Sequence, residues 1–291
     1  MAIYEPISAD GPRRRYRLRS PATLEPIGEL ECMSDADVAQ AVERARKAQP
    51  GWAARTFDER AAFMRRVCEH VLEQQDRIME TVIRETGKTP TEAFAMEVFS
   101  SCNALTYYAK NVPKFLKPQK KRVKGVMGLM KQLRIVYKPV GVVGIIVPWN
   151  GPFVLGMNQT VQALMAGNTV LLKGSEVTPY STKLVVDLFE EAGLPDGVLQ
   201  AVMGDGQTGA AVVEGGVDKV SFTGSVATGR KVAEACGRQL IPVTLELGGK
   251  DAMIVCKDAD LDRAASGALI GSCMNTGQYC CGTERIYVVD D

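Results

Sequence analysis

Cys280 is the strongest candidate nucleophile in this sequence. It lies in residues 277–282 (GQYCCG), where the flanking glycines favour an exposed turn over a packed position. A thiolate in such a turn is a strong nucleophile. Two alternatives stay open, because most interior cysteines are inert and because Cys280 and Cys281 could instead form a vicinal redox pair. The pair lacks the accompanying ligands of a zinc site, so no metal is expected.

Glu246 is the candidate general base. It stands between Leu245 and Leu247, and the glycines of residues 248–249 follow. Apolar surroundings disfavour an ionised carboxylate, so we expect Glu246 to resist ionisation and to act as a base near neutral pH.

Two glycine-containing segments are candidate phosphate sites. Gly204, Gly206 and Gly209 form a G-x-G-x-x-G pattern between a predicted strand and a predicted helix. The dinucleotide fingerprint also has an acid about 20 residues further on, and residues 222–229 contain none, so a plain glycine turn is an equal alternative. Residues 222–229 (FTGSVATG) repeat the arrangement with Ser225 at the helix start. A pyrophosphate or an ordinary serine cap explains that junction equally well.

Lys173 and Glu176 end another predicted strand. A cation and a carboxylate three residues apart would suit the hydroxyls of an adenosine ribose. A solvent-exposed ion pair is the alternative.

These residues need a scaffold that brings strand ends to one edge. After residue 140, short β-branched runs alternate with helical patterns, which is typical of a parallel sheet. Strands are predicted at 140–147, 169–173, 199–202, 219–222, 244–246 and 253–255, and helices near 155–165, 181–192, 207–214, 227–238 and 261–275. Right-handed crossovers then predict an α/β fold, with an open, twisted, mostly parallel Rossmann-like sheet and flanking helices. Its ligand should bind at the carboxyl edge.

A helical segment precedes that sheet. Residues 1–32 have short strand signals, Ser34 is a candidate cap for a helix through residue 48, and helices are predicted at 56–85 and 91–110.

Composition excludes several classes of protein. The 291 residues have 46% hydrophobic and 24% charged side chains and a net charge of +1, which fits a globular protein and gives no whole-chain attraction to nucleic acid or membrane. The basic run at 114–124 is expected to be a charged hairpin. The single histidine, His70, excludes a multi-histidine zinc site and leaves only one candidate base for a histidine triad.

Membrane insertion and export are not expected. Residues 140–172 carry no charged side chain, but Pro148, Pro152 and several amide side chains make a buried soluble core the better explanation. The N-terminus has no apolar signal core, and the eight scattered cysteines favour a reducing cytoplasm.

Five motifs together resemble the aldehyde dehydrogenase family. They stand in the family order along nearly the whole chain: PWN at 148–150, K-x-S-E at 173–176, FTGSxxxG at 222–229, LELGGK at 245–250 and GQxC at 277–280. Each alone would be an ordinary coincidence, whereas five in order are not.

The resemblance implies oxidation of an aldehyde to a carboxylic acid with NAD or NADP. Cys280 would attack the aldehyde carbonyl, the amide of Asn150 and the backbone N–H of Cys280 would hold the oxyanion, and Glu246 would activate water to hydrolyse the thioester. Hydride would pass to the nicotinamide.

The resemblance also implies a division of the chain into four parts: a lead-in and helical part of the coenzyme domain (1–117), a β-hairpin or oligomerisation arm (118–139), a Rossmann-like dinucleotide-binding core (140–256) and the start of a catalytic domain with the nucleophile motif (257–291).

The same resemblance implies a cofactor site. Lys173 and Glu176 would contact the adenosine ribose, residues 224–229 the pyrophosphate, and residues 204–209 would lie near the adenine. A carboxylate at Glu176 repels a 2′-phosphate, so NAD is expected rather than NADP. The cofactor residues expected are Pro148, Trp149, Lys173, Ser175, Glu176, Gly204, Gly206, Gly209, Phe222, Thr223, Gly224, Ser225, Gly229 and Leu247.

The sequence departs from the family pattern in three places. Gly174 stands where proline is usual, and Cys273 stands where an aromatic or aliphatic residue is usual. Family members continue past the nucleophile into a catalytic domain, whereas this sequence ends 11 residues after Cys280. We therefore expect a coenzyme domain with the nucleophile strand and without the C-terminal catalytic domain, and a homo-oligomer in the full-length form. A catalytically incomplete dinucleotide-binding or assembly module and a basic-arm nucleic-acid binder are the alternatives.

Overall fold

Five parallel strands form the central sheet of the computed structural model, which describes residues 2–7 and 13–290. Residues 1, 8–12 and 291, which belong to the first and last predicted segments, lie outside the described residues. The strands are β6 (Val142–Ile146), β7 (Thr169–Lys173), β8 (Leu199–Val202), β9 (Lys219–Gly224) and β10 (Val243–Leu247), in the order β10-β9-β6-β7-β8. The register pairs Ile146 with Lys173 and with Phe222, so the carboxyl ends of these strands meet at one edge. The predicted α/β fold is confirmed.

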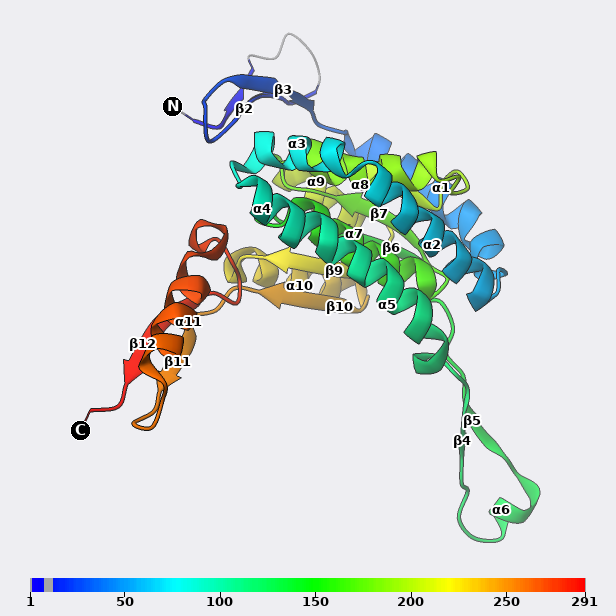
Figure 1. Cartoon of the computed structure of the whole chain (residues 1–291). Coiled ribbons are helices and arrows are strands. Elements are labelled where there is room, and N and C mark those ends of the chain that lie inside the picture. Colours follow the sequence, from blue (N-terminus) through cyan, green and yellow to red (C-terminus); the bar gives the residue numbers. More distant parts are fainter. Residues whose placement is uncertain (1, 8–12, 291) are drawn as a thin grey trace.

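Helices cover both faces of this sheet (Figure 1). The connecting helices are α7 (Pro152–Met165), α8 (Pro179–Glu191), α9 (Gly206–Glu214) and α10 (Val226–Gln239). Strand residues alternate between two cores: Val143 and Ile145 pack with α7 and α8, while Val142 and Ile146 pack with α9 and α10. This alternation follows from the two-residue repeat of a strand, and it explains why the whole of β6 is apolar.

The N-terminal part supplies a small sheet and the outer helices. Strands β1 (Tyr4–Pro6), β2 (Arg15–Arg19) and β3 (Pro26–Glu31) form an antiparallel sheet, and α1 (Asp35–Ala53) begins at the predicted Ser34 cap. The single helix predicted at 56–85 was wrong, because Gln74 separates α2 (Phe57–Glu73) from α3 (Gln75–Thr86). The helix predicted at 91–110 is a run of three elements: α4 (Pro90–Glu92), the π-helix η1 (Ala93–Phe99) and α5 (Ser100–Phe115).

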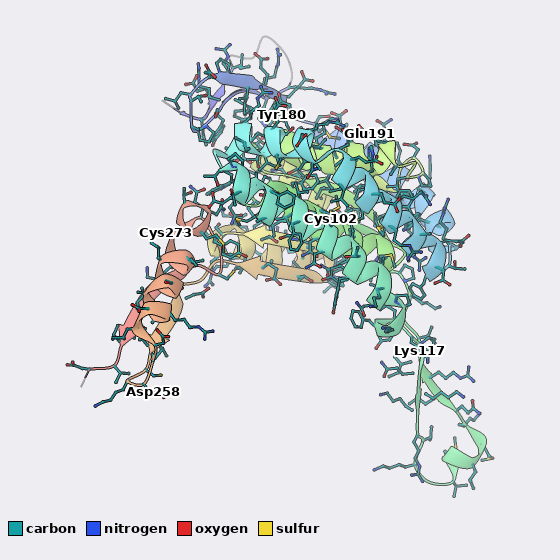
Figure 2. All side chains as sticks on the ribbon, in the orientation of Figure 1. Cys102, Lys117, Tyr180, Glu191, Asp258 and Cys273 are labelled. Carbon is teal, nitrogen blue, oxygen red and sulfur yellow. The ribbon has the colours of Figure 1, made fainter. Side chains whose placement is uncertain are left out.

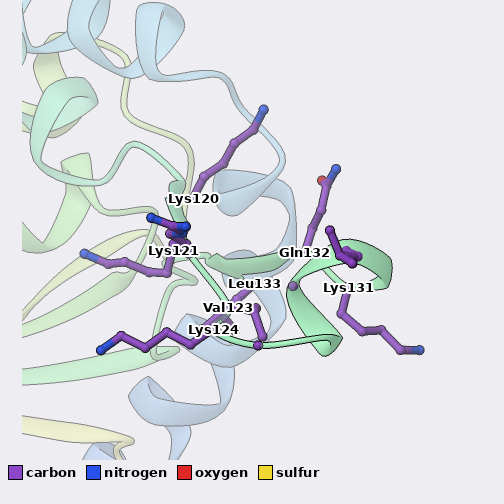
Figure 3. A pocket seen from close by; sticks show the side chains of 11 residues that line it. Lys120, Lys121, Val123, Lys124, Lys131, Gln132 and Leu133 are labelled. Carbon is purple, nitrogen blue, oxygen red and sulfur yellow. The ribbon is translucent and has the colours of Figure 1, made fainter.

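A basic arm projects from the body (Figure 1). Strands β4 (Gln119–Lys121) and β5 (Leu133–Ile135) pair antiparallel, and the short helix α6 (Met127–Met130) lies at the tip. Lysines and Arg122 line a hollow of about 620 Å³ in this arm (Figure 3). Leu129 at the tip is 87% exposed. No helix in the described ranges has the length and apolar character needed to span a bilayer.

The last elements form a unit beside the central sheet. Strand β11 (Asp251–Val255) pairs in parallel with β12 (Thr283–Val288), across α11 (Leu261–Cys273) and the 3₁₀ turn η2 (Met274–Gly277). The strand predicted at 253–255 exists, but its predicted place in the central sheet was wrong. Its parallel partner lies one helix further along the chain, so β11, α11 and β12 form their own crossover unit. Ile254 and Leu261 of this unit are 68% and 70% exposed.

Glu85 ties the helical half to the sheet domain. Its carboxylate, at the end of α3, accepts hydrogen bonds from the backbone N–H groups of Tyr180 (2.8 Å) and Ser181 (2.7 Å) at the start of α8. Tyr180 in turn donates from its hydroxyl to the carbonyl of Glu29 in β3 (Figure 2). Burial of the Glu85 carboxyl raises its pKa to about 7, against an ordinary value of 4.5, and the bonds from Ser181 and Tyr180 oppose that rise.

This raised pKa predicts a pH-dependent stability. The native state holds the Glu85 proton more tightly than the unfolded chain, so its contribution is complete below about pH 4.5 and is lost as the pH rises through about 7. Because of this group, the free energy of unfolding of the wild type should fall by on the order of 3 kcal/mol between pH 4.5 and 8. Glu85→Gln should lack this fall. Urea denaturation at several pH values measures this. Glu80→Gln, at an exposed position of the same helix, is the matched control and should keep the decline. An equal decline in wild type and Glu85→Gln would contradict the prediction.

Candidate functional site

The carboxyl edge of the sheet lines a cavity of about 510 Å³. Most of the predicted cofactor residues lie on its wall: Pro148, Trp149, Lys173, Ser175, Glu176, Gly206, Gly209, Phe222, Thr223, Gly224 and Ser225. A neighbouring cavity of about 430 Å³ shares Trp149, Ser175 and Glu176 and extends to Gln278, two residues before Cys280. The structure therefore brings the predicted dinucleotide contacts and the nucleophile loop to one region.

Three predicted cofactor residues, Gly204, Gly229 and Leu247, do not line the larger of these two cavities. A side chain at Gly204 would collide with Thr208, and this glycine has φ of +154°, so both its lack of a side chain and its backbone freedom are used. A Cβ at Gly229 would lie 2.7 Å from Leu247 Cδ2. Gly229 therefore permits α10 to approach β10, and Leu247 fills the space between them.

Charges at the helix N-termini select one place for an anion. Glu85 accepts from the first turn of α8, and Glu97 accepts from the N–H groups of Phe153 (3.1 Å) and Val154 (2.8 Å) in α7. Asp205 caps α9. Of these four helices, only α10 has a neutral side chain accepting from its first turn: the Ser225 hydroxyl accepts from Thr228 N at 3.2 Å. Ser225 lies within the predicted pyrophosphate turn. Since carboxylates already satisfy the other three N-termini and repel phosphate, α10 is the favoured anion site.

Asp205 also joins this edge to the N-terminal sheet. Arg14 Nε donates to it at 2.7 Å and the Tyr16 hydroxyl donates at 2.9 Å. Burial opposes ionisation of Asp205, but the hydrogen bonds from Arg14, Tyr16 and Thr208 together outweigh it and hold the pKa of this carboxyl well below its usual range. The predicted adenine wall at 204–209 is thus fixed by an ion pair that the sequence spacing did not reveal.

Lys173 and Glu176 form an ion pair in which only the lysine is buried. Their Nζ and Oε2 atoms are 3.6 Å apart, and the side chains of Lys173 and Glu176 are 5% and 29% exposed. The alternative of a fully solvent-exposed ion pair therefore does not hold for Lys173. Burial lowers the pKa of Lys173, and Glu176 is the nearest charge that opposes this effect. Both side chains line the cavity, which suits them to polar groups of a bound ligand.

Cys280 lies exposed in a turn after η2, as predicted. Partial desolvation, followed by the neighbouring Cys281 thiol, raises the pKa of Cys280 above its ordinary value. The described residues therefore expose this thiol, and on balance they disfavour its thiolate.

Asn150 is bonded directly to the nucleophile loop. Its Nδ2 donates to the carbonyl of Gln278 at 3.0 Å. An amide nitrogen carries two hydrogens, so this bond leaves one donor for another acceptor. The structure thus brings Asn150 and Cys280, which are 130 residues apart, to one place.

Glu246 does not have the environment that its neighbours predicted. Neighbouring residues of a strand point to opposite faces, so Leu245 and Leu247 pack toward α10 while Glu246 is exposed on the other face of β10. The expected apolar surroundings are absent among the described residues. Glu246 pairs in register with Thr223, a residue of the cavity wall, so it remains near the site.

Three residues of the site were missed by sequence reasoning. Lys88 Nζ donates to the carbonyl of Asn150 at 2.8 Å, Asn275 Nδ2 donates to the same oxygen at 2.9 Å, and Glu92 accepts from Asn275 N at 2.8 Å. Asparagine two residues before a glycine is a weak signal for the left-handed conformation that Asn275 adopts. Lys88 and Glu92 carry no comparable signal, because nothing local distinguishes them from solvated helix residues.

His70 lines neither of the two cavities. His70 on α2 contacts Glu191 at 2.9 Å, and Arg77 contacts the same carboxylate, in a surface cluster with α8. No group of three or more His, Cys, Asp or Glu side chains there could hold a metal ion.

Known proteins match this chain over most of its length. The model of the Aldehyde dehydrogenase family matches residues 7–291. A 4,4'-diapolycopene aldehyde oxidase from Methylomonas sp is 40% identical over 269 residues, which are 92% of this chain and 51% of that protein. A putative succinate-semialdehyde dehydrogenase from Mycolicibacterium smegmatis, whose name specifies NADP(+), is 44% identical over 267 residues, 91% of this chain and 50% of that protein.

A solved structure agrees with these matches. A Mycobacterium tuberculosis aldehyde dehydrogenase complexed with NAD+ superposes with a TM-score of 0.87 and 37% identity, and the match covers 92% of this chain and 55% of that one. The chain spans about half the length of the curated relatives it matches.

Proposed function

The chain belongs to the aldehyde dehydrogenase family, and from this membership we propose that it takes part in oxidising an aldehyde to a carboxylic acid with NAD. The observation that carries the proposal is the hydrogen bond from Asn150 to Gln278, which joins an amide donor to the loop of the candidate nucleophile beside the dinucleotide cavity. Covalent catalysis at a thiol needs a donor at that place, because negative charge develops on the carbonyl oxygen.

Residues of the chain would carry out the covalent steps. The Cys280 thiolate attacks the aldehyde carbon and forms a thiohemiacetal, whose oxyanion accepts hydrogen bonds from Asn150 Nδ2 and from the backbone N–H of Cys280. NAD, when bound, supplies the hydride acceptor that converts this adduct to a thioester. Glu246 then takes a proton from a water molecule while the oxygen of that water attacks the thioester carbon. The C–S bond breaks, which releases the carboxylic acid and regenerates the Cys280 thiol.

The residues present fit a dinucleotide. The neutral cap of α10 favours a pyrophosphate, while Lys173 offers a buried donor and Glu176 a partly exposed acceptor to the adenosine ribose. Glu176 supports NAD over NADP, because its carboxylate would repel a 2′-phosphate. The relative named for NADP(+) makes this preference the point to test.

A second candidate is a dinucleotide-binding or assembly module. Two properties of Cys280 favour this function for the described residues taken alone. Its thiol is exposed to water, and its pKa is raised, which disfavours the reactive thiolate. Catalysis depends on reacting groups held in a closed, oriented site.

The basic arm supports a homo-oligomer. Seven of the 35 Lys and Arg residues lie in the arm at 118–139, which leaves 28 basic against 34 acidic residues elsewhere, a formal charge of −6. An arm of one copy is therefore attracted to the body of another. The cytoplasm is the compartment we propose, and the eight cysteines, all free thiols, support a reducing environment.

Replacing the nucleophile tests the main proposal. Cys280→Ala should abolish aldehyde-dependent NADH formation and leave NAD affinity nearly unchanged, since the thiol is needed for chemistry and not for the adenosine contacts. Absorbance at the NADH band and calorimetry with NAD measure the two effects. Cys281→Ala is the matched control and should stay active. The reverse pattern would contradict the assignment of the nucleophile, and NAD binding without turnover in the wild type would favour the second candidate.

Replacing the candidate base tests the second half of the reaction. Glu246→Gln should allow the first hydride transfer and then stall at the thioester, which gives a burst of NADH followed by little turnover in stopped-flow absorbance. Glu284→Gln, on the separate strand β12, is the control and should show no such stall. If Glu246→Gln also lost the burst, the carboxylate would act earlier, for example on the thiol.

Replacing Glu176 tests the cofactor preference. Glu176→Gln should lower the ratio of the dissociation constants of NADP and NAD on the order of tenfold, because it removes a repulsive charge and frees Lys173 for a phosphate. Glu214→Gln, on the wall of the same cavity, should change the ratio by less than about twofold. An unchanged ratio in Glu176→Gln would contradict the role of this carboxylate.

A further inference from the structure

Lys88 and Glu97 form an ion pair in the interior, next to Asn150. Their Nζ and Oε1 atoms are 3.1 Å apart, and the two side chains are 2% and 0% exposed. Two ions removed from water are costly unless further hydrogen bonds compensate them. Both side chains make such bonds with the same short segment: Lys88 with the carbonyl of Asn150, and Glu97 with the N–H groups of Phe153 and Val154.

The π-helix η1 explains how two carboxylates reach the site. Glu92 immediately precedes η1 and Glu97 lies within it, five residues later. In an α-helix, residues five apart are about 140° apart around the axis. The i to i+5 hydrogen bonding of a π-helix brings them close to one face. Glu97 therefore contacts the start of α7 while Glu92 accepts a hydrogen bond from Asn275 N.

Asn275 completes a set of bonds around Asn150. Its Nδ2 donates at 2.9 Å both to the carbonyl of Asn150 and to the carbonyl of Gln278, and the residue is 3% exposed. Asn150 Nδ2 donates to that same Gln278 carbonyl. The main-chain oxygen of Asn150 is thus held by Lys88 and Asn275, while its side-chain amide is held by the nucleophile loop. None of these contacts between described residues uses the second hydrogen on Asn150 Nδ2.

We propose that Lys88, held by Glu97, is a positioning residue that fixes Asn150 so that its free amide N–H meets the oxygen of an acyl group on Cys280. The inference rests on the proposed function. An oxyanion donor is effective only when its placement is fixed before the reaction, and a shift of about 1 Å can cost on the order of 10²-fold in rate. Without the cation, the Asn150 carbonyl loses one of its two partners and Glu97 becomes an unpaired buried charge.

Two reactions of the Cys280 thiol separate this role from general damage. With p-nitrophenyl acetate, a C–S bond forms at the carbonyl carbon, negative charge passes to the carbonyl oxygen, and p-nitrophenolate leaves. With iodoacetamide, a C–S bond forms at a saturated carbon, iodide leaves, and no oxyanion develops. Both rates are followed by fragment-ion mass spectrometry that assigns each modification to Cys280, because Cys273 and Cys281 are exposed thiols in the same stretch of sequence. Their ratio, acylation over alkylation, reports the oxyanion donors and cancels changes in thiol exposure or ionisation.

Lys88→Met should lower this ratio on the order of tenfold, and Lys88→Arg should restore part of it because a cation returns to the same cavity. Lys183→Met, an exposed lysine paired with Asp187 on α8, is the matched control and should leave the ratio unchanged. Because Lys88→Met leaves a buried charge, the double variant Lys88→Met/Glu97→Gln, which removes both charges, is measured beside it and should show the same loss. Circular dichroism identifies the variant that folds.

Asn150→Ala distinguishes the two ways of failing. If it lowers the ratio while the folded Lys88 variants change it by less than about twofold, the inference about Lys88 is overturned and the role of Asn150 stands. If Asn150→Ala leaves the ratio unchanged, the proposed oxyanion role of Asn150 is itself wrong. Support requires that both substitutions lower the ratio and that combining them adds little, as expected for residues acting through one donor.

Discussion

Helix N-termini that converge on one sheet edge impose the main electrostatic constraint on this molecule. Each helix begins with backbone N–H groups that lack partners within the helix and that carry a partial positive charge. Strands β6 to β9 are parallel, so the helices that follow them all begin at the same edge. Carboxylates satisfy three of these helices, and two of the three carboxylates come from the helical half of the chain. The helical half therefore both covers the sheet and supplies the carboxylates at two of these N-termini.

The same constraint explains the costly polar interior. Glu85 and Glu97 are buried, and burial raises the pKa of both carboxyl groups. Glu97 lies beside Lys88, and Asp205 lies beside Arg14, so cations accompany two of the three carboxylates. Replacing such groups by apolar side chains often does not reduce stability. What they provide here is position: the segment 150–154 and the loop 204–209 are each held by bonds that come from distant parts of the chain.

Two surfaces of the described residues are suited to contacts beyond them. The unit of β11, α11 and β12 exposes Ile254, Leu261 and Val288 to a degree unusual for strand and helix residues of a compact core. The arm exposes Leu129 among cations, and no acidic residue lies between Glu97 and Glu176. The first surface is apolar and the second is charged, so burial would stabilise a contact at the unit, while charge attraction would guide a contact of the arm.

Local sequence patterns determined much of the fold and the membership of the family. β-branched runs, glycine turns and serine caps depend on interactions between near neighbours, so the strands β6 to β10 and the helices between them were predictable. The five motifs that indicate the family are present in the sequence itself. The exposure of Cys280 also followed from its neighbours. Two predictions about the partners and boundaries of elements were wrong: β11 pairs with β12 and not with the central sheet, and Gln74 divides a predicted helix. Glu246 is exposed because adjacent strand residues face opposite ways.

Lys88, Glu97 and Asn275 became visible only in the tertiary structure, because the contacts between Lys88 and Asn150 and between Asn275 and Glu92 span 62 and 183 residues. Burial and pairing over such separations depend on how the elements pack, and no local pattern of residue types records that packing.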